Sequence, residues 1–559
     1  MTSAPPILLY DTTLRDGMQR EGMSVSVDEK VRIAGRIADL GVHVIEGGFP
    51  GSNPKDEEFF RKLEQEPLGG ALVAAFGTTR GAGVRADADA KLRVLADCWA
   101  PVAALVGKTW DLHVEKVLRV DREENLRMIA ESVTFLRGQG KRVFYDAEHF
   151  FDAYAAHPDY ALACVRVAAE AGAEAVCLCD TNGAALPMQV AEVVESVVAL
   201  LGETCLVGIH THNDAGCAVA NSLIAVDRGA GSVQGTINGY GERCGNADLC
   251  AIIPALKLKM GRDCVSDRDL AKLTDTARFV AELCNISPDQ HQPYVGHNSF
   301  AHKGGLHVSA VERDPSTFEH IDPALVGNSP HVLVSELSGR ATINQRVREL
   351  GYPLREEREL ADRVLKRVKQ QEHAGYHYEA ADASFELLLR TEMGLKVELF
   401  HLETFRIIVE KREDGETVSE ATVKVYVDGD RFVETAEGNG PVNALDKALR
   451  RAIERKFPSV HDIRLVNYSV RILDENKGTA ATTRVLIDSS DGRDSWGSVG
   501  VGVNVVQASW EALVDSISYG LLRRGGDEAS AAERLAPGGV TADAEAAGTR
   551  APQTAEEAE

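Results

Sequence analysis

The sequence lacks paired cysteines, long hydrophobic runs and a leader-like N-terminus. Its ten cysteines all lie between Cys98 and Cys284, and none stands in a Cys-x-x-Cys pair. A disulfide framework or a structural zinc site is therefore not expected, and reduced thiols in a cytoplasmic protein are the simpler interpretation. No stretch approaches about 18 uninterrupted apolar residues, so no membrane span is expected. The opening "MTSAPPILLY" has no basic region, so no signal peptide is expected either.

Basic residues are few relative to acidic ones. The chain has 61 Lys and Arg against 85 Asp and Glu, a net charge of −24. Such a surface is not attracted to nucleic-acid phosphates or to anionic membranes, so neither partner is expected. A small anionic substrate is not excluded, because it meets only local charge. With 559 residues the chain is too long for one ordinary core, and two or three domains are expected.

Eight short apolar runs recur before Asn238, each followed by a longer helix-like stretch. They are "PILLYDT", "VHVIEGGF", "ALVAAFG", "VAALVGK", "RVFYDAE", "AVCLCDT", "LVGIHTH" and "SVQGTIN". The first helix-like stretch starts with a capping box from Ser26 to Glu29. Eight strand–helix units over about 250 residues predict a (β/α)8 TIM barrel, here residues 1–284. A doubly wound open sheet is the alternative, but it would more often show a glycine-rich phosphate turn after its first strand.

The remainder of the chain changes character twice. Residues 285–383 combine a His- and Gly-rich stretch with a highly charged helix-like run, and we expect a linker or lid subdomain there. Residues 384–523 contain two strand–strand–helix halves, which predict an internally repeated α+β domain. Its first helix should begin at Pro441, a favoured first helical position. The Ala-, Gly- and Glu-rich tail, residues 524–559, is expected to be disordered.

Side chains at the carboxyl ends of barrel strands are the candidates for chemistry. His210 and His212 stand two apart in a strand and therefore point to the same side. Asp16, after the first strand, adds a carboxylate, and Asn246, after the eighth, adds an amide oxygen. This mixed nitrogen and oxygen set favours Mg²⁺ or Mn²⁺, with Zn²⁺ also possible. The alternative is that the histidines are ordinary buried core residues.

Arg15 stands directly before Asp16 in the stretch "LYDTTLRDGMQR". If Asp16 holds a metal that chelates an α-keto acid, Arg15 would face the keto oxygen that becomes an alkoxide when a carbon nucleophile attacks. A cation and a guanidinium on one developing negative charge would stabilise that transition state. The alternative is a surface Arg–Asp pair without a chemical role.

Several of these stretches resemble a known family. "DTTLRDGMQ", "HTHND" and "GYGERCGNADL" are similar to signatures of the barrel enzymes that condense acetyl-CoA with an α-keto acid, the 2-isopropylmalate, homocitrate and citramalate synthases. "YDAEHFFDAY", "CLCDTNGA", "SFAHKGGLHVSA" and "HIDPALVGN" look most like the long-chain citramalate synthases. The resemblance covers nearly the whole chain to about residue 523. It implies a Claisen-type condensation of acetyl-CoA with pyruvate and thioester hydrolysis to citramalate and CoA, in isoleucine biosynthesis.

The resemblance also implies roles for individual residues. It assigns metal binding to Asp16, His210, His212 and Asn246, oxyanion stabilisation to Arg15, acid–base work to Glu148 with His307, keto-acid contact to Thr181, and supporting substrate contacts to Gln19 and Glu46. His307 would come from the linker and close over the neighbouring barrel, and His302 is the alternative for that role. One position departs from the family: Phe318 stands before "EHIDP" where a tyrosine is expected, so a proton relay through a phenol there is in doubt.

The C-terminal domain resembles the regulatory dimerisation domain of the family. This implies a homodimer and feedback by isoleucine. The glycine turns in "EGNGPVNALDKAL" and "VGVGVNVVQASWEAL" are the candidate effector site, because glycine lets backbone amides approach a carboxylate. The alternative is a dimerisation module alone. For the chain as a whole, two further interpretations stay open: a 2-isopropylmalate or homocitrate synthase, distinguished by pocket size, and a catalytically inactive amino-acid sensor on the same scaffold.

Overall fold

The computed structural model describes residues 5–525 except 333–337, 353–357, 396–397, 414, 474–477, 479 and 493. The predicted disordered tail therefore lies outside the described residues beyond residue 525. The chain forms two compact units, Met1–His302 with Ala310–His331, and Lys303–Ser309 with Val332–Glu559. The domain boundaries expected at residues 284 and 383 stay a prediction.

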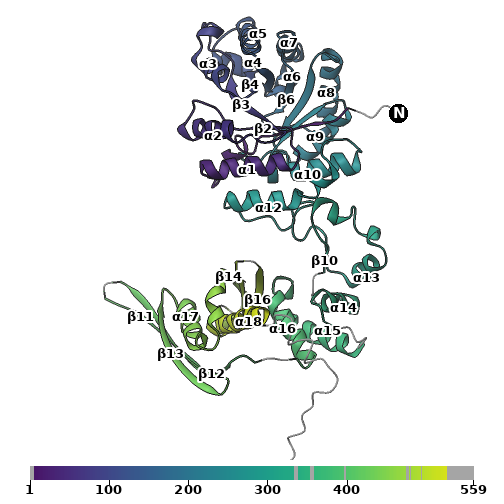
Figure 1. Cartoon of the computed structure of the whole chain (residues 1–559). Helices are drawn as coiled ribbons and strands as arrows, with labels where there is room; N and C mark the ends of the chain where they lie inside the picture. Colours follow the sequence, from purple (N-terminus) through teal and green to yellow (C-terminus); the bar gives the residue numbers. More distant parts are fainter. Residues whose placement is uncertain are drawn as a thin grey trace, which may run out of the picture. The chain divides into compact units, whose positions relative to one another are not determined.

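The first unit contains a closed barrel of eight parallel strands in sequence order, with β1 pairing β8 (Figure 1). The strands are β1 (Leu8–Asp11), β2 (Val44–Glu46), β3 (Leu72–Thr78), β4 (Val102–Lys108), β5 (Arg142–Glu148), β6 (Ala175–Asp180), β7 (Leu206–Thr211) and β8 (Ser232–Gly235). Each strand lies within one of the eight apolar runs, except that β3 extends one residue beyond its run, to Thr78. The prediction of a (β/α)8 barrel is confirmed.

Helices surround the barrel in Figure 1. They are α1 (Val27–Asp39), α2 (Pro54–Gln65), α3 (Ala90–Asp97), α4 (Asp111–His113), α5 (Arg122–Gly138), α6 (Phe150–Ala156), α7 (Pro158–Glu170), α8 (Pro187–Leu201), α9 (Ala218–Asp227), α10 (Leu249–Pro254), α11 (Asp267–Leu270) and α12 (Leu273–Leu283). The predicted capping box opens α1: Ser26 Oγ accepts from the Glu29 amide, and Glu29 Oε2 accepts from the Ser26 amide. Ile33 and Ile37 bury the inner face of α1.

A separate layer of apolar side chains fills the barrel interior. It includes Tyr10, Val44, Val102, Phe144 and Ala175, all buried. The polar side chains of the site lie beyond this layer, at the carboxyl ends of the strands, as in other barrels of this kind. Short elements follow the barrel in the sequence: β9 (Ala301–His302), α13 (Gly305–Arg313) and β10 (His331–Val332).

Besides the part of α13 within Lys303–Ser309, the second unit contains α14 (Arg340–Glu349), α15 (Arg358–His373) and α16 (Asp382–Glu392). Two repeated halves follow: β11 (His401–Lys411), β12 (Thr417–Val427), β13 (Asp430–Gly438) and α17 (Pro441–Ile453), then β14 (Arg464–Ile472), β15 (Thr483–Ser490), β16 (Ser495–Gly502) and α18 (Val505–Gly525). The predicted repeated α+β domain is confirmed. Each half has three antiparallel strands, where the sequence predicted two. The strands β13 and β16 were missed because β13 is too polar and β16 too glycine-rich to show a strand pattern.

Packing explains two glycines of the strands that precede α17 and α18, Gly438 at the end of β13 and Gly500 inside β16. A Cβ at Gly438 would collide with the Ala444 amide, and a Cβ at Gly500 would collide with the Ala508 carbonyl. The strands can approach the helices closely only without side chains at these positions. Pro441 is the first residue of α17, as predicted. Among the described residues, no helix combines the length and the hydropathy needed to cross a membrane.

Candidate functional site

Three of the residues expected to bind a metal converge at the carboxyl end of the barrel. Asp16 follows β1 and precedes the short helix Gly17–Gln19, while His210 lies near the end of β7 and His212 follows it. Asp16 Oδ2 lies 3.2 Å from His210 Nε2 and 3.8 Å from His212 Nε2, and the two Nε2 atoms are 3.3 Å apart. All three side chains are buried. The same-face geometry expected of the two histidines is therefore present.

Asn246 is brought to this cluster by the loop after β8. A backbone bridge joins it to His212, and its Nδ2 lies 2.7 Å from Asp16 Oδ2 and 3.2 Å from His210 Nε2. A side chain at Gly241 would collide with the Asn246 amide, so this glycine is needed for the loop. Asn246 Oδ1 is buried without a hydrogen-bond partner. The oxygen and nitrogen of a side-chain amide can be exchanged by rotating the amide by 180°. In the rotated form, the Asn246 oxygen faces the cluster.

The protonation of the cluster suits a divalent cation. Burial raises the pKa of Asp16, but Arg15 and the hydrogen bond with His210 outweigh it and hold the pKa well below its usual value. Burial, reinforced by His210, lowers the pKa of His212 to about 4, which keeps its imidazole neutral. A carboxylate, two imidazoles and an amide together fit a hard to borderline divalent metal.

Gln234 on β8 orients His210. Its Oε1 lies 2.9 Å from His210 Nδ1, and its Nε2 donates to Asp146 Oδ1 at 3.0 Å. His210 Nδ1 therefore faces Gln234 Oε1, and its Nε2 faces Asp16. Burial lowers the pKa of His210, but the hydrogen bond and the charge of Asp16 outweigh the effect of burial and raise the pKa. Burial, together with Glu46, raises the pKa of Asp146 to about 6. No sequence pattern indicates this chain of hydrogen bonds, because it depends on register across the barrel.

Gln234→Leu is expected to weaken binding of a divalent metal by about 10- to 100-fold, the usual cost of losing a group that orients a ligand. The reason is that His210 loses the acceptor that fixes its tautomer. Titration calorimetry with Mn²⁺ measures the effect. Gln189→Leu, which removes an exposed helix-capping glutamine, is the control and should bind Mn²⁺ like the unaltered chain. Equal affinity in both variants would show that Gln234 does not orient His210.

Arg15 is fixed beside the cluster and does not lie in a surface pair. Its Nη1 is 3.2 Å from Asp16 Oδ1, its Nε pairs with Glu46 Oε1, and its guanidinium lies 4.2 Å from the centre of the Phe76 ring. Glu46, fully buried, also accepts from Tyr10 Oη at 2.6 Å. Burial lowers the pKa of Arg15, but Glu46 and Asp16 outweigh it and raise the pKa. Glu46 therefore positions Arg15.

Glu148, the last residue of β5, pairs with Lys108, the last residue of β4. Lys108 was not among the predicted residues, although it ends one of the apolar runs. Thr181 follows β6, and its Oγ1 accepts from the His149 amide at 2.9 Å. The strand ends thus bring Glu148 and Thr181 to neighbouring positions at one rim of the barrel.

An aromatic cluster lies near this rim. The ring centroids of His113 and His149 are 4.4 Å apart, and Trp110 stacks on His113 with a centroid distance of 5.4 Å. Burial lowers the pKa of His113, and the charges of Lys108 and Glu148 act on it as well. Trp110 and His113 were not predicted, because the segment after β4 lies outside the stretches that resemble the family.

The other predicted residues have separate surroundings. Gln19 is exposed at the end of the short helix after Asp16. His302 Nε2 lies 3.6 Å from Glu319 Oε1 in the first unit. His307 lies on α13, in the second unit, and is exposed. The roles of Gln19, His302 and His307 stay predictions.

Three family models match successive parts of the chain. HMGL-like matches residues 6–280, homocitrate synthase post-HMGL domain-like matches 294–375, and LeuA allosteric (dimerisation) domain matches 379–521. The first describes the barrel that carries the cluster, and the last describes the repeated α+β domain.

Curated relatives match over nearly the whole length. An (R)-citramalate synthase of Geobacter sulfurreducens is 51% identical over 92% of this chain and 97% of its own length, and one of Streptomyces coelicolor is 52% identical with the same coverage. A probable 2-isopropylmalate synthase of Methanopyrus kandleri is 32% identical over 93% of this chain and 99% of its own length. With this identity, this coverage and an intact polar cluster at the barrel end, the chain is an enzyme of the (R)-citramalate synthase family.

Proposed function

We propose that this chain condenses acetyl-CoA with pyruvate and hydrolyses the thioester, giving (R)-citramalate and CoA. The observation that carries the proposal is the cluster of Asp16, His210 and His212 beside Arg15, in a chain 51% identical to an (R)-citramalate synthase over 92% of its length. The smaller acceptor distinguishes this reaction from that of the 2-isopropylmalate synthases.

The proposed metal is Mg²⁺ or Mn²⁺, held by Asp16, His210, His212 and Asn246, with Zn²⁺ as the alternative. When bound, it would supply a positive charge for the keto-acid oxygens. Arg15 would donate its remaining N–H groups to the keto oxygen as that oxygen gains negative charge. Because Glu46 and Phe76 already hold the guanidinium, little reorganisation is needed during the reaction. Thr181 would contact the carboxylate of pyruvate.

Glu148 is the proposed base for the methyl group of acetyl-CoA. A carboxylate oxygen of Glu148 would take the proton as the new carbon–carbon bond forms, with His307 as its partner in acid–base work. Lys108, paired with Glu148, would hold the carboxylate in the orientation that this transfer requires, since a carbon acid transfers its proton only to a well-placed base. Water then hydrolyses the thioester, which makes the overall reaction irreversible.

Release of free thiol from acetyl-CoA tests the proposal. The full chain with Mn²⁺ is assayed with pyruvate, 2-oxoisovalerate, 2-oxoglutarate or no acceptor, and the product with pyruvate is identified by chiral chromatography. We expect thiol release with pyruvate to exceed release with either larger acid. A preference for 2-oxoisovalerate would instead support a 2-isopropylmalate synthase, which the relative at 32% identity makes the second candidate. No release with any acid would contradict both.

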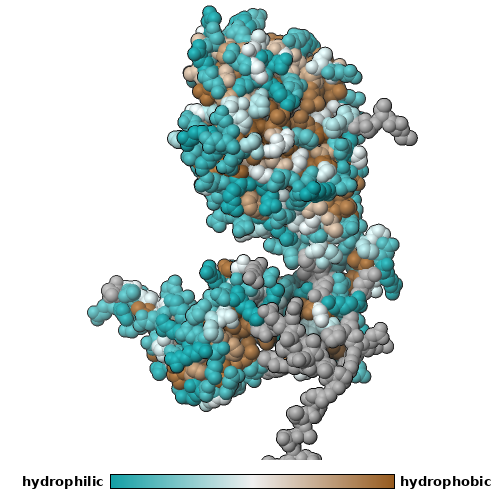
Figure 2. Space-filling view, in the orientation of Figure 1, coloured by the Kyte–Doolittle hydropathy of each residue, from teal (hydrophilic) through white to brown (hydrophobic). Residues whose placement is uncertain are grey.

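We further propose a homodimer formed through the C-terminal domain. Helix α18 packs on β15 and β16, and it leaves the apolar side chains of the edge strand β14 open. Val470 and Ile472 pair with Val485 and Thr483, so they are on the helix-bearing side of the sheet, yet they are 44% and 54% exposed. Figure 2 shows further hydrophobic residues on the surface of this unit. A second copy would cover them.

Val470→Lys is expected to convert the dimer to a monomer, because a charge would enter the apolar face of β14. Size-exclusion chromatography with light scattering measures the mass. Ser469→Lys adds the same charge one residue away, on the opposite face of the strand, and should stay dimeric. A dimer in both variants would mean that β14 is not the interface.

The proposal also includes feedback by isoleucine through the C-terminal domain and a cytoplasmic location. The LeuA allosteric (dimerisation) domain match at residues 379–521 supports a regulatory role for this part of the chain. The route of feedback would be a change in how often His307 and its segment close over the partner barrel.

A further inference from the structure

Hydrolysis of the thioester, the second step of the proposed reaction, needs a group that takes a proton from water. A neutral water molecule is a weak nucleophile, and a positioned base removes its proton as the oxygen attacks. In the proposed reaction Glu148 carries the methyl proton of acetyl-CoA after the first step. A second base beside Glu148 would let hydrolysis follow directly, and the rim of the barrel has a candidate in His113.

His113 is the last residue of α4, in the segment that follows β4. Its Nδ1 is buried and has no hydrogen-bond partner among the described residues. A buried polar atom of this kind is costly, and water or a ligand is its usual partner. The next turn of the chain, Val114–Leu118, is π-helical, a form that is frequent at functional sites. The segment therefore holds an imidazole nitrogen that a water molecule can satisfy.

The charge state of His113 suits a base. Burial is the largest effect and lowers the pKa of His113 below its usual value, and His149 and Lys108 lower it further. Glu148 and Asp152 raise the pKa but do not reverse the shift. The imidazole is therefore neutral near pH 7, and one of its nitrogens can accept a proton. Because the charges of Lys108 and Glu148 act on His113, it lies near the proposed base of the first step.

Neighbouring rings hold the His113 imidazole in place. Trp110 stacks on it at an interplanar angle of 25°, and the His149 ring meets it edge-on at 64°. His149 has a φ of 56°, a left-handed conformation that is uncommon for a residue with a Cβ and occurs at active sites. Its Nδ1 lies 3.1 Å from Asp152 Oδ2, which also accepts from Asn182 Nδ2 at 3.0 Å. A ring held in this way needs little reorganisation for a proton transfer.

The same cluster contacts the proposed keto-acid site. The His149 amide donates to Thr181 Oγ1 at 2.9 Å, and Thr181 is the proposed contact for the carboxylate of pyruvate. His113 is thus linked on one side to the Lys108–Glu148 pair and on the other to Thr181. The thioester that the first step forms would lie at this rim.

We propose that His113 is the catalytic base for hydrolysis of the thioester, an assignment that rests on the proposed function. Water attacks the carbonyl carbon as one of its protons moves to His113 Nδ1. The tetrahedral intermediate then collapses and the carbon–sulfur bond breaks. The proton on Nδ1 passes to the departing CoA thiolate, so the products are the free acid and CoA, and His113 is neutral again.

His113→Asn tests the assignment, because an amide cannot take a proton at neutral pH. The full chain with Mn²⁺, in excess over acetyl-CoA, reacts with pyruvate, and acid-quenched samples are analysed by mass spectrometry. Hydrolysis should slow about 10²-fold or more, the usual contribution of a general base. Citramalyl-CoA, the thioester of the proposed product, should then accumulate, and thiol release should fall behind the loss of acetyl-CoA. In the unaltered chain the two should proceed in step.

His461→Asn is the matched control, because His461 is 63% exposed in the second unit and pairs with Glu454. It should not accumulate citramalyl-CoA. His113→Gln is a second variant with the same expected result as His113→Asn, and unaltered Mn²⁺ binding shows that each variant is folded. Thiol release in step with acetyl-CoA loss in both His113 variants, at any overall rate, would overturn the assignment.

Supplied citramalyl-CoA keeps this assignment apart from the proposed function. Equal hydrolysis of this thioester by His113→Asn and by the unaltered chain would overturn the role of His113, whichever keto acid is the acceptor. An unaltered chain that hydrolyses citramalyl-CoA but condenses acetyl-CoA with none of the keto acids would contradict the proposed reaction. Loss of that hydrolysis in His113→Asn would then still support His113 as the base.

Discussion

Replacing His212 with alanine is expected to lower kcat/KM for pyruvate by more than about 100-fold and to abolish Mn²⁺ binding measured by titration calorimetry. The expected loss exceeds the usual cost, about 10- to 100-fold, of altering a group that only orients a ligand. His212 Nε2 lies 3.3 Å from His210 Nε2 and 3.8 Å from Asp16 Oδ2, so its removal leaves three of the four proposed ligands and only one of the two imidazoles. Circular dichroism should show an unaltered fold, because the barrel core does not depend on this side chain.

His401→Ala is the control for loss of a histidine as such. His401 is 67% exposed on β11 and pairs only with Glu398 among the described residues, so its loss should change neither metal binding nor turnover. A His212→Ala chain that keeps both its Mn²⁺ affinity and most of its activity would rule out the cluster as the metal site. Loss of Mn²⁺ binding with activity retained would mean that the reaction does not need a metal at this cluster.

Arg15→Lys is expected to lower kcat about 10²- to 10³-fold, the usual cost of removing one donor to a developing oxyanion. Lysine keeps the charge but lacks the planar fork that contacts Glu46 and Asp16 together and packs on Phe76. The effect should appear in kcat more than in KM for pyruvate, because the alkoxide exists only near the transition state.

The matched control is Arg20→Lys, five residues further along the chain. Arg20 is exposed and lies 5.2 Å from the centre of the Tyr240 ring, away from the Asp16 carboxylate, and its replacement should leave kcat nearly unchanged. An Arg15→Lys chain with normal kcat and a raised KM for pyruvate would mean that Arg15 binds the substrate carboxylate instead.

The sequence alone determined the barrel and the set of candidates at its rim. Strand positions follow from short apolar runs, which are local, and strand ends of a parallel barrel must meet at one rim. His210 and His212 share a side because side chains alternate along a strand. Asp16 and Asn246 could be named for the same reason, although 230 residues separate them, since each follows a strand whose end was predictable.

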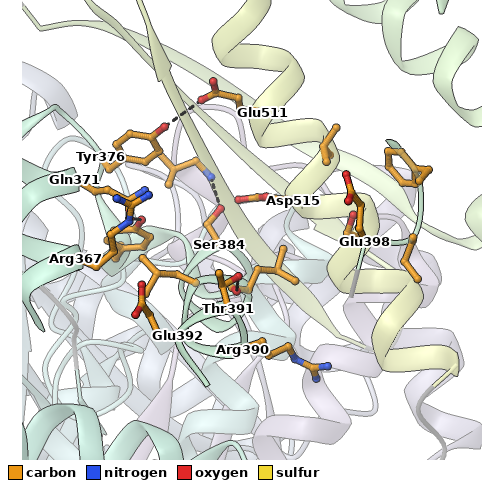
Figure 3. Close-up of a pocket in the computed structure, with 18 residues that line it drawn as sticks. Arg367, Gln371, Tyr376, Ser384, Arg390, Thr391, Glu392, Glu398, Glu511 and Asp515 are labelled. Atoms are coloured by element: carbon orange, nitrogen blue, oxygen red, sulfur yellow. Dashed lines mark hydrogen bonds between the residues drawn. The ribbon is translucent and has the colours of Figure 1, made fainter. Parts of the chain in front are cut away.

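Only the tertiary structure decided which of these candidates touch and what supports them. The Lys108–Glu148 pair and the hydrogen bonds from His210 through Gln234 to Asp146 join different strands, and such contacts depend on register and side-chain conformation across the barrel. The second unit also has a cavity of about 450 Å³, which brings together residues as far apart as Tyr376 and Glu511 (Figure 3). A cavity exists where packing is incomplete, and no local pattern of residues records that. The sequence therefore determines the barrel strands and the rim at which they end, while three-dimensional packing determines which side chains each charged group contacts.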